Sequence, residues 1–381
     1  MVNSKNKYAL IFLLFLSEIA IAQPAPGENF LQGLAYYQQE MYDSALISFT
    51  ISKGMNEKDA LSWYYTGLSF YEQDRNRDAI DNFLEAEKLS PGLASFMLAK
   101  AYAREGLLDK SLEYLEINLK SNYKKPESTI LLDKDLSLFE NRKEWINFWR
   151  DNTYYSPFDK TLAEAAYLTK TEDYLEAIEV LSDGLKRGFR SSPIYASRAK
   201  VYLELENDEL ALKDLNDALD SDRRNPELYF LRGEVNYRLE KYKQAVEDFT
   251  NAIKYEPADF NAYMKRAMAN SKAGMYEPAR EDMVYYLKYF PNDDEAWYTF
   301  GKINMEAEKY LDALRNLNKA LEMNTSDPRY YIARGESYYN ARTYRYASND
   351  FSMALDLDPR NAEAYYLKGL TAAMEGNNEL A

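Results

Sequence analysis

The chain has 381 residues, of which 47 are Lys or Arg and 62 are Asp or Glu, so its net charge is −15. A surface this acidic repels phosphate backbones and anionic lipid heads, which argues against binding nucleic acid through charge. The absence of both His and Cys excludes disulfides, Cys nucleophiles, Ser-His-Asp triads and zinc sites built on those side chains.

The N-terminal segment has the pattern of a secretory signal peptide. Two Lys precede an apolar run over residues 8–16, and the small residues Ala20 and Ala22 follow it. We therefore predict a signal peptide over residues 1–22. The alternative is an uncleaved membrane anchor, but the run is shorter than the ~20 residues that span a bilayer. The cleaved chain is expected to be secreted across the inner membrane, without a stable membrane span, into the periplasm or the outer envelope.

After this segment the sequence repeats with a period of 34 residues. Thirty-five Tyr beside only 14 Gly and 12 Pro favour packed helices over a turn-rich β fold. Small residues recur at the repeat spacing in two series, which are Gly233, Ala267, Gly301, Gly335 and Gly369, and Ala211, Ala245, Ala279, Ala313, Ala347 and Ala381. Two antiparallel helices approach to about 8–10 Å where small side chains lie at their crossing. Each unit is therefore predicted to be a helix pair.

This pattern resembles the tetratricopeptide repeat, a helix–turn–helix unit of 34 residues. The resemblance covers most of the chain after the signal peptide, and it implies an all-α fold, a right-handed superhelical solenoid of antiparallel helix pairs. Stacked neighbours would then complete one continuous core. The repeats are predicted to start at residues 26, 60, 92, 158, 192, 226, 260, 294, 328 and 362.

The repeats are expected to form two blocks. The N-terminal block has three repeats over residues 26–120, and the C-terminal block has six repeats plus an unfinished seventh over residues 158–381. Residues 121–157 depart from the pattern, so we predict a degenerate helical linker or adaptor there. Trp145 and Trp149 are four residues apart and share one helical face, which serves either packing or docking.

The last repeat stops at Ala381, before its second helix. Its first helix carries an apolar face that includes Tyr365, Tyr366 and Leu370. Solenoids normally end in a polar cap. Two explanations stay open: the sequence is truncated there, or a partner or a second copy of the chain covers this face by self-association.

The resemblance also implies a peptide-binding groove, because in this family the first helix of each repeat lines the concave face. An apolar aromatic floor with charges of both signs suits an extended or helical peptide segment. Carried over to the later repeats, the groove positions are Phe230, Glu234, Tyr237, Arg238, Met264, Met268, Lys272, Tyr298, Lys302, Met305, Ile332, Glu336 and Tyr339. The corresponding positions in the early repeats are Phe30, Leu34, Tyr37, Tyr64, Leu68, Tyr71, Phe96, Lys100 and Arg104.

The groove positions leave one alternative open and argue against one kind of ligand. Tyr is common in the family at several groove positions, so these tyrosines serve either ligand contact or packing within the solenoid. The Lys and Asn with which chaperone-adaptor members clamp a C-terminal carboxylate are absent from the corresponding positions here. Binding of a chaperone tail is therefore not expected.

No catalytic, metal-ligating or cofactor-binding residue is predicted. The acidic run Asp293-Asp294-Glu295 lies at a repeat junction, where an N-terminal helix cap explains it. We predict a non-enzymatic scaffold that binds partner proteins or peptide segments in the bacterial periplasm or cell envelope. Two alternatives stay open: a chaperone-like escort of secreted polypeptides, and the repeat portion of a larger protein with an effector domain beyond Ala381.

Overall fold

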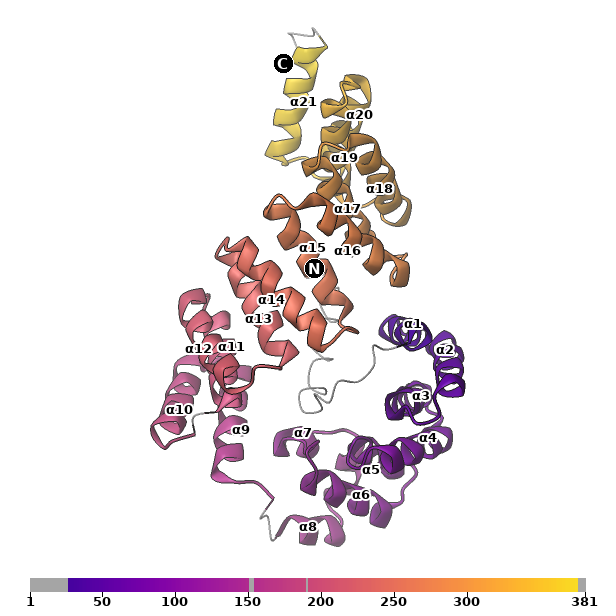
Figure 1. Ribbon diagram of the computed structural model, residues 1–381, viewed down its shortest axis with the longest axis vertical. Coiled ribbons are helices and arrows are strands. Elements are labelled where there is room, and N and C mark those ends of the chain that lie inside the picture. The colour runs from indigo at the N-terminus through magenta and orange to yellow at the C-terminus, as the bar shows by residue number, and fades with distance from the viewer. Residues whose placement is uncertain (1–26, 151–153, 190, 376–381) are drawn as a thin grey trace. The chain divides into compact units, whose positions relative to one another are not determined.

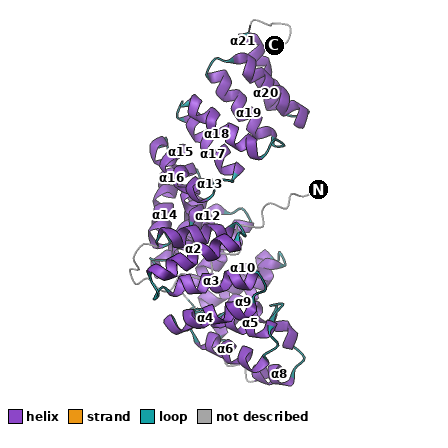
Figure 2. Cartoon of the chain, turned by 90° about the vertical axis from the view of Figure 1, so that its right-hand side faces the viewer, coloured by secondary structure: helices purple, strands orange, loops and turns teal. Residues whose placement is uncertain are grey.

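The computed structural model describes residues 27–150, 154–189 and 191–375 (Figure 1). Within these ranges all regular secondary structure is helical (Figure 2), which confirms the predicted all-α class. The predicted signal peptide and Ala381 lie outside the described residues.

The chain divides into two compact units, which we describe separately. Unit 1 comprises Met1–Val235 with Lys254–Ala258, and unit 2 comprises Asn236–Ile253 with Asp259–Ala381. The division falls inside two helices of the predicted C-terminal block. The block boundaries drawn from the sequence stay a prediction.

Unit 1 is built mainly of antiparallel helix pairs joined by short turns, with one irregular stretch between α6 and α9. Its helices are α1 (Glu28–Gln38), α2 (Tyr42–Met55), α3 (Ala60–Glu72), α4 (Asn76–Leu89), α5 (Ser95–Arg104), α6 (Leu108–Lys120), α7 (Glu127–Leu131), the 3-10 helix η2 (Leu136–Phe139), α8 (Lys143–Arg150), α9 (Pro157–Lys170), α10 (Tyr174–Lys186), α11 (Ser192–Glu204) and α12 (Asp208–Ser221). The first part of α13 (Pro226–Arg238) completes the unit.

Unit 2 continues the same architecture. Besides the end of α13 and most of α14 (Tyr242–Tyr255), its helices are α15 (Phe260–Lys272), α16 (Tyr276–Tyr289), α17 (Asp294–Glu306), α18 (Tyr310–Met323), α19 (Pro328–Asn340), α20 (Tyr344–Leu357) and α21 (Ala362–Met374). Helices α13, α15, α17, α19 and α21 begin at predicted repeat starts. The helix pair is thus the repeating unit, as the period indicates.

In several pairs a glycine on the first helix fits against a large residue on the second. A Cβ added to Gly67 would lie 2.5 Å from the ring of Phe83, and one added to Gly335 would lie 2.6 Å from the ring of Phe351. Both rings are fully buried. The glycines therefore allow the helix approach, because any larger side chain would occupy the space that the ring fills.

An Arg–Asp ion pair recurs inside the later repeats. In unit 2, Arg266 binds both carboxylate oxygens of Asp282 at 2.6 and 2.8 Å and also donates to Thr250 on the preceding helix pair at 3.3 Å. Arg334 binds Asp350 in the same way at 2.7 Å. In unit 1, Arg198 pairs with Asp214 and Ser182. Each Arg thus joins the two helices of its own repeat to the repeat before it.

The described residues of this irregular stretch, 121–150 and 154–157, form no regular helix pair. They contain the short helix α7, the 3-10 turn η2 and α8, and they pack through Ile130, Leu136 and Trp145 into one apolar cluster with α5 and α6. Trp145 and Trp149 lie 5.8 Å apart between ring centroids. This stretch therefore belongs to the core of unit 1 and does not hang free as an extended connection.

Candidate protein-binding groove

The first helices of successive repeats lie side by side in unit 2. Helix α15 contacts α17, α17 contacts α19, and α19 contacts α21. Their shared surface, which we call the inner face, carries eight of the predicted groove residues: Met264, Met268, Lys272, Tyr298, Lys302, Met305, Glu336 and Tyr339. A ligand that lies along this surface would cross several repeats, as a groove of this family requires.

Burial separates the predicted groove residues into two groups. Phe230 and Ile332 are only 4% and 6% exposed, so they belong to the core and offer a ligand almost no surface. Phe230 and Glu234 lie in unit 1, whereas Tyr237 and Arg238 lie in unit 2. The residues of the inner face itself are half-buried or exposed. Their role in binding stays a proposal.

The aromatic part of the inner face is held rigidly. The ring of Tyr298 stacks on that of Tyr330 at 4.9 Å, and the guanidinium of Arg329 lies 5.4 Å from the Tyr298 ring centroid. Tyr298 also packs against a buried cluster that includes Leu317. Burial raises the pKa of Tyr298 to about 12, so its phenol stays protonated at neutral pH. One face of the Tyr298 ring is therefore taken up by packing against Tyr330.

Charges of both signs flank the apolar side chains. Lys272 and Glu306 form an ion pair at 2.8 Å between α15 and α17, and Ser271 donates to the same carboxylate at 2.5 Å. Burial alone would raise the pKa of Glu306, but the hydrogen bonds from Lys272 and Ser271 outweigh it and lower that pKa. Burial and the nearby Glu363 raise the pKa of Glu336. The inner face therefore holds a fixed ion pair, Lys272 with Glu306, and a second carboxylate, Glu336, whose charged form a cation of a ligand would stabilise.

The methionines supply the adaptable part of the inner face. Met264 and Met305 pack with one side against buried clusters of unit 2, and Met268 is likewise half-buried. Unbranched thioether side chains rearrange at low cost and suit partners of varied shape. This surface therefore combines a rigid ring with side chains that can adjust.

Tyrosines at the ends of the first helices serve packing within the repeat. Tyr339 meets Tyr344 at 5.5 Å, and Tyr237 meets Tyr242 at 5.4 Å, both in T-shaped geometry. Tyr37 and Tyr42 do the same in unit 1. These contacts agree with the packing alternative given for these tyrosines, and their contact with a ligand stays a prediction.

The early groove positions of unit 1 are mostly closed. Phe30, Leu34, Tyr64, Leu68, Tyr71 and Phe96 are all buried, which corrects the expectation that they line an open groove. Lys100 and Arg104 contact carboxylates of the segment between α7 and η2. Sequence reasoning missed these carboxylates because residues 121–157 lack the repeat pattern that assigns positions.

The recurring Arg–Asp pair was also missed, although a signal for it exists. Arg198, Arg266 and Arg334 lie at multiples of the 34-residue period, and each has its Asp 16 residues later. In the repeat that starts at residue 294, Phe300 and Asn316 stand at these two positions. Comparing polar positions between repeats, and not only the small and aromatic ones, would have found the pair.

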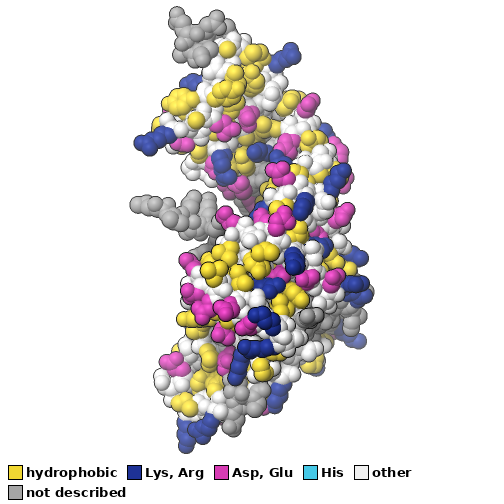
Figure 3. Space-filling model, turned by 90° about the vertical axis from the view of Figure 1, so that its left-hand side faces the viewer, with side chains coloured by type: hydrophobic (Ala, Val, Ile, Leu, Met, Phe, Trp, Pro, Cys, Tyr) yellow, Lys and Arg dark blue, Asp and Glu magenta, His cyan; other side chains and the backbone are white. Residues whose placement is uncertain are grey.

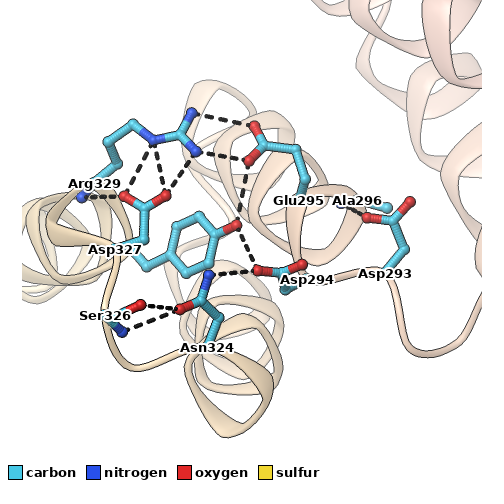
Figure 4. Close-up of polar contacts among 9 residues, drawn as sticks. Asp293, Asp294, Glu295, Ala296, Asn324, Ser326, Asp327 and Arg329 are labelled. Carbon is cyan, nitrogen blue, oxygen red and sulfur yellow. Dashed lines mark hydrogen bonds and ion pairs between the residues drawn. The ribbon is translucent and has the colours of Figure 1, made fainter. Parts of the chain in front are cut away.

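The acidic run at the α16–α17 junction is structural (Figure 4). Asp293 caps α17 by accepting from the amide of Ala296 at 2.9 Å, which confirms the predicted cap. Asp294 accepts from the hydroxyl of Tyr330 at 3.1 Å, and Glu295 pairs with Arg329 at 2.8 Å. These carboxylates therefore tie successive repeats together.

Other kinds of site are not apparent in the described part of the chain. Among residues 27–150, 154–189 and 191–375, no group of three or more acidic side chains is arranged to hold a metal ion. None of the helices in those ranges is both long and apolar enough to cross a membrane. Figure 3 shows basic, acidic and apolar side chains interleaved over the face that it draws, so that charges of both signs lie close to one another there.

Comparison with known proteins identifies the repeats. Family models described as the tetratricopeptide repeat match residues 226–259, 30–94, 64–117 and 332–381. The match over residues 226–259 coincides with one predicted repeat. No curated protein sequence matches the chain.

Solved structures of similar proteins come from several bacteria. The C-terminal part of a TPR repeat-containing protein from Cytophaga hutchinsonii is 19% identical, with a TM-score of 0.48 over 58% of this chain and 91% of that one. A tetratricopeptide repeat protein from Parabacteroides merdae is 17% identical, with a TM-score of 0.42 over 73% and 97%. Pseudomonas aeruginosa pilF is 15% identical, with a TM-score of 0.45 over 55% and 96%.

The family matches agree with the geometry of the described residues. Helix pairs recur every 34 residues, a small residue on one helix meets a large one on the next, and first helices line a shared face. Repeats of this kind serve as scaffolds for protein–protein interaction. The chain belongs to the tetratricopeptide-repeat family.

Proposed function

We propose that this protein is a non-enzymatic scaffold that binds a segment of a partner polypeptide along the inner face of unit 2. The observation that carries the proposal is the arrangement on α15 and α17. There, half-buried Met268, Met305 and Tyr298 stand on the same two helices as the Lys272–Glu306 ion pair. Apolar contacts between charges of both signs suit a peptide with alternating apolar and charged side chains.

The chemistry of this surface sets the expected strength of binding. Methionine side chains and the free edge of Tyr298 would take apolar side chains of the partner, while Lys302 and Glu336 would fix its direction through opposite charges. Grooves of this kind bind with a Kd near 1 μM, or about −8 kcal/mol. A scaffold that assembles and releases its partners needs an affinity in this range.

A site-specific cross-linking experiment tests the proposal. A photoreactive residue placed at Met268 or Met305 is expected to capture a partner in cells. The same residue placed at Val284 or Leu311, which are 60% and 71% exposed on the second helices α16 and α18, is expected to capture none. Capture only from the second helices would place the binding surface elsewhere.

Charge exchange on the inner face gives a second test with matched composition. Lys302→Glu combined with Glu336→Lys keeps the net charge but reverses the direction of the local field. We expect the affinity for the captured partner to fall by about tenfold, because like charges then face each other. Unchanged affinity with unchanged circular dichroism would argue against this face.

We further propose that the chain is exported to the periplasm or the outer envelope. The support is the sequence pattern of residues 1–22, which lie outside the described residues. Mass spectrometry of the mature protein is expected to find Gln23 at its N-terminus. A retained N-terminal segment would favour the membrane-anchored alternative.

A chaperone-like escort is a second candidate, favoured by the methionines of the inner face. Adaptable thioether side chains suit many clients better than one. The cross-linking experiment separates the two roles. One partner in fixed proportion supports the scaffold, whereas a broad set of unfolded polypeptides supports the escort.

A further inference from the structure

The segment between α7 and α8 lies against the first helices of unit 1. The 3-10 turn η2 contacts α5, whose residues Lys100 and Arg104 stand at groove positions of the third repeat. Tyr71 on α3 stands at a groove position of the second repeat. The segment, residues 133–139, therefore occupies the place that the family gives to a ligand.

The polar contacts of this segment are made by two carboxylates. Asp133 pairs with Lys100 at 2.8 Å, and Asp135 pairs with the Nε of Arg104 at 3.0 Å. Asp135 also accepts a hydrogen bond from the hydroxyl of Tyr71. All three partner groups come from α3 and α5. The side chains of Asp133 and Asp135 are only 11% and 10% exposed.

The apolar contacts follow directly in the sequence. Leu136 is fully buried and Phe139 is 6% exposed, and both lie in the cluster that contains Phe96, Ala99 and Ala103 of α5. The segment thus binds α3 and α5 through two carboxylates two residues apart, followed by two apolar side chains. A peptide with the same order of carboxylates and apolar side chains could make the same contacts with α3 and α5.

The segment holds its own bound shape. The carboxylate of Asp133 accepts from the amides of Asp135 and Leu136 at 3.0 and 3.2 Å, which forms a local turn. Between and before its buried side chains lie exposed ones, with Leu132 at 74% and Leu138 at 64%. Because the element is short and its turn hydrogen bonds are local, its release would break its contacts with α3 and α5 and uncover Leu136 and Phe139, but would leave the backbone hydrogen bonds of the helix pairs in place.

We propose that the inner side of α3 and α5 is a binding site for an acidic peptide of the pattern Asp-x-Asp-Leu-x-x-Phe, and that residues 133–139 occupy it in cis. A partner polypeptide with two carboxylates at this spacing, followed by apolar side chains, competes with this segment for Lys100, Arg104 and Tyr71. The site is separate from the inner face of unit 2 and does not rest on it.

Residues 133–139 belong to the same chain as their site, and this covalent link affects how competition by a free peptide can be measured. A tethered segment has an effective concentration in the millimolar range, so a free peptide competes poorly with it in the wild-type chain. Replacing Asp133 and Asp135 by Asn removes the charges but keeps the oxygen that forms the local turn. Arg104 keeps its contacts with the backbone carbonyl of Tyr71 at 3.0 Å and with Asp74 at 3.1 Å. Lys100 loses both of its carboxylate partners and keeps only the amide oxygens of the new Asn side chains as acceptors.

The experiment uses the full chain and a fluorescein-labelled peptide with the sequence of residues 131–140. Binding is followed by fluorescence anisotropy. The variant Asp133→Asn with Asp135→Asn is expected to bind the peptide at least about tenfold more tightly than the wild type, because the cis competitor is weakened. Adding Lys100→Glu with Arg104→Glu should abolish this binding.

Two controls separate a specific site from general charge attraction. Lys88→Glu with Lys110→Glu, on the second helices α4 and α6, changes the net charge equally at side chains that are 74% and 53% exposed. This change should leave peptide binding intact. A peptide with both Asp replaced by Asn should not bind. Equal loss with either protein variant would overturn the proposal.

A measurement on a chain with both aspartates keeps the proposal testable if the Asn variant fails to fold. The chain has no Cys, so Ser137→Cys gives one position for an environment-sensitive dye. Excess unlabelled peptide at millimolar concentration should shift the dye emission as the segment leaves its site. An emission that stays constant at saturating peptide would show a permanent structural contact and refute exchange.

Discussion

The first two repeats and the repeats from residue 260 onward use the same helix pair but different contacts between pairs. In α1–α4 the contacts are aromatic: the ring of Tyr65 lies within 6.0 Å of the rings of Phe30, Tyr37 and Phe49. In α15–α16 and α19–α20 the recurring contact is an Arg that binds its own Asp and the preceding repeat. Small residues at the helix crossing specify the hairpin, whereas the contact between hairpins can be of either kind.

The two kinds of contact differ in what they demand. A cluster of rings tolerates small shifts because its energy depends mainly on buried area. A bidentate Arg–carboxylate pair requires fixed geometry and loses much of its value if one partner is removed. The later repeats are therefore expected to be more sensitive to single polar substitutions, and the early repeats to changes in volume.

The largest expected effect comes from breaking one ion pair of the later repeats. Asp350→Ala leaves the guanidinium of Arg334 in a site where it is only 21% exposed, and the repeat is expected to lose about 3 kcal/mol. Hydrogen exchange of the amides in α19 and α20 measures this loss locally. The matched control is Arg334→Phe with Asp350→Asn, which copies Phe300 and Asn316 of the preceding repeat. This double variant should lose clearly less than Asp350→Ala, and an equal loss would contradict the account.

A smaller effect tests what the two regions share. Gly67→Ala places a Cβ 2.5 Å from Phe83, and Gly335→Ala places one 2.6 Å from Phe351. Each is expected to cost about 1–3 kcal/mol of unfolding free energy, because the ring must move within a packed core. Gly54→Ala in α2, where nothing lies within 4 Å, should instead stabilise by about 0.5–1 kcal/mol. Urea unfolding of the three variants measures these changes. Similar results at Gly67 and Gly54 would show that the crossing is not tightly packed.

The smallest expected effect is a change of stability with pH that arises from buried Lys and Arg side chains. Burial lowers the pKa of Lys125 in unit 1 to about 7, helped by the nearby Lys100. For Arg334, burial also acts to lower the pKa, but the hydrogen bond with Asp350 outweighs it, and the net pKa is raised. Lys125, in the stretch after α6, and Arg334, in the later repeats, therefore respond differently to pH.

The sign of the pH dependence follows from Lys125. Between pH 7 and its ordinary pKa of 10.5, the unfolded chain binds a proton at this amine that the folded chain does not bind. Stability is therefore expected to rise with pH in this window, by up to about 1 kcal/mol from pH 7 to pH 8. Unfolding free energies at these pH values should lose this rise in Lys125→Met. A rise of the same size in the variant would assign it to other groups.

Sequence reasoning located the repeats well because small residues and large apolar ones recur in register. Helices α13, α15, α17, α19 and α21 begin where the period predicts. It located the candidate groove only in part. The positions came from the family pattern, which does not say that Phe230 and Ile332 are buried while Met268 and Lys302 are accessible. Burial depends on how neighbouring pairs stack, and that information is not local.

The sequence by itself determined the helix pairs, their spacing and the absence of His and Cys chemistry, because these depend on residue type and short-range periodicity. Only the tertiary structure decided which groove positions stay open. It brought Asp133 and Asp135, from a stretch without the repeat pattern, against Lys100 and Arg104 some 30 residues earlier. Contacts between segments without a shared period depend on the packing of the whole unit, and no local pattern records them.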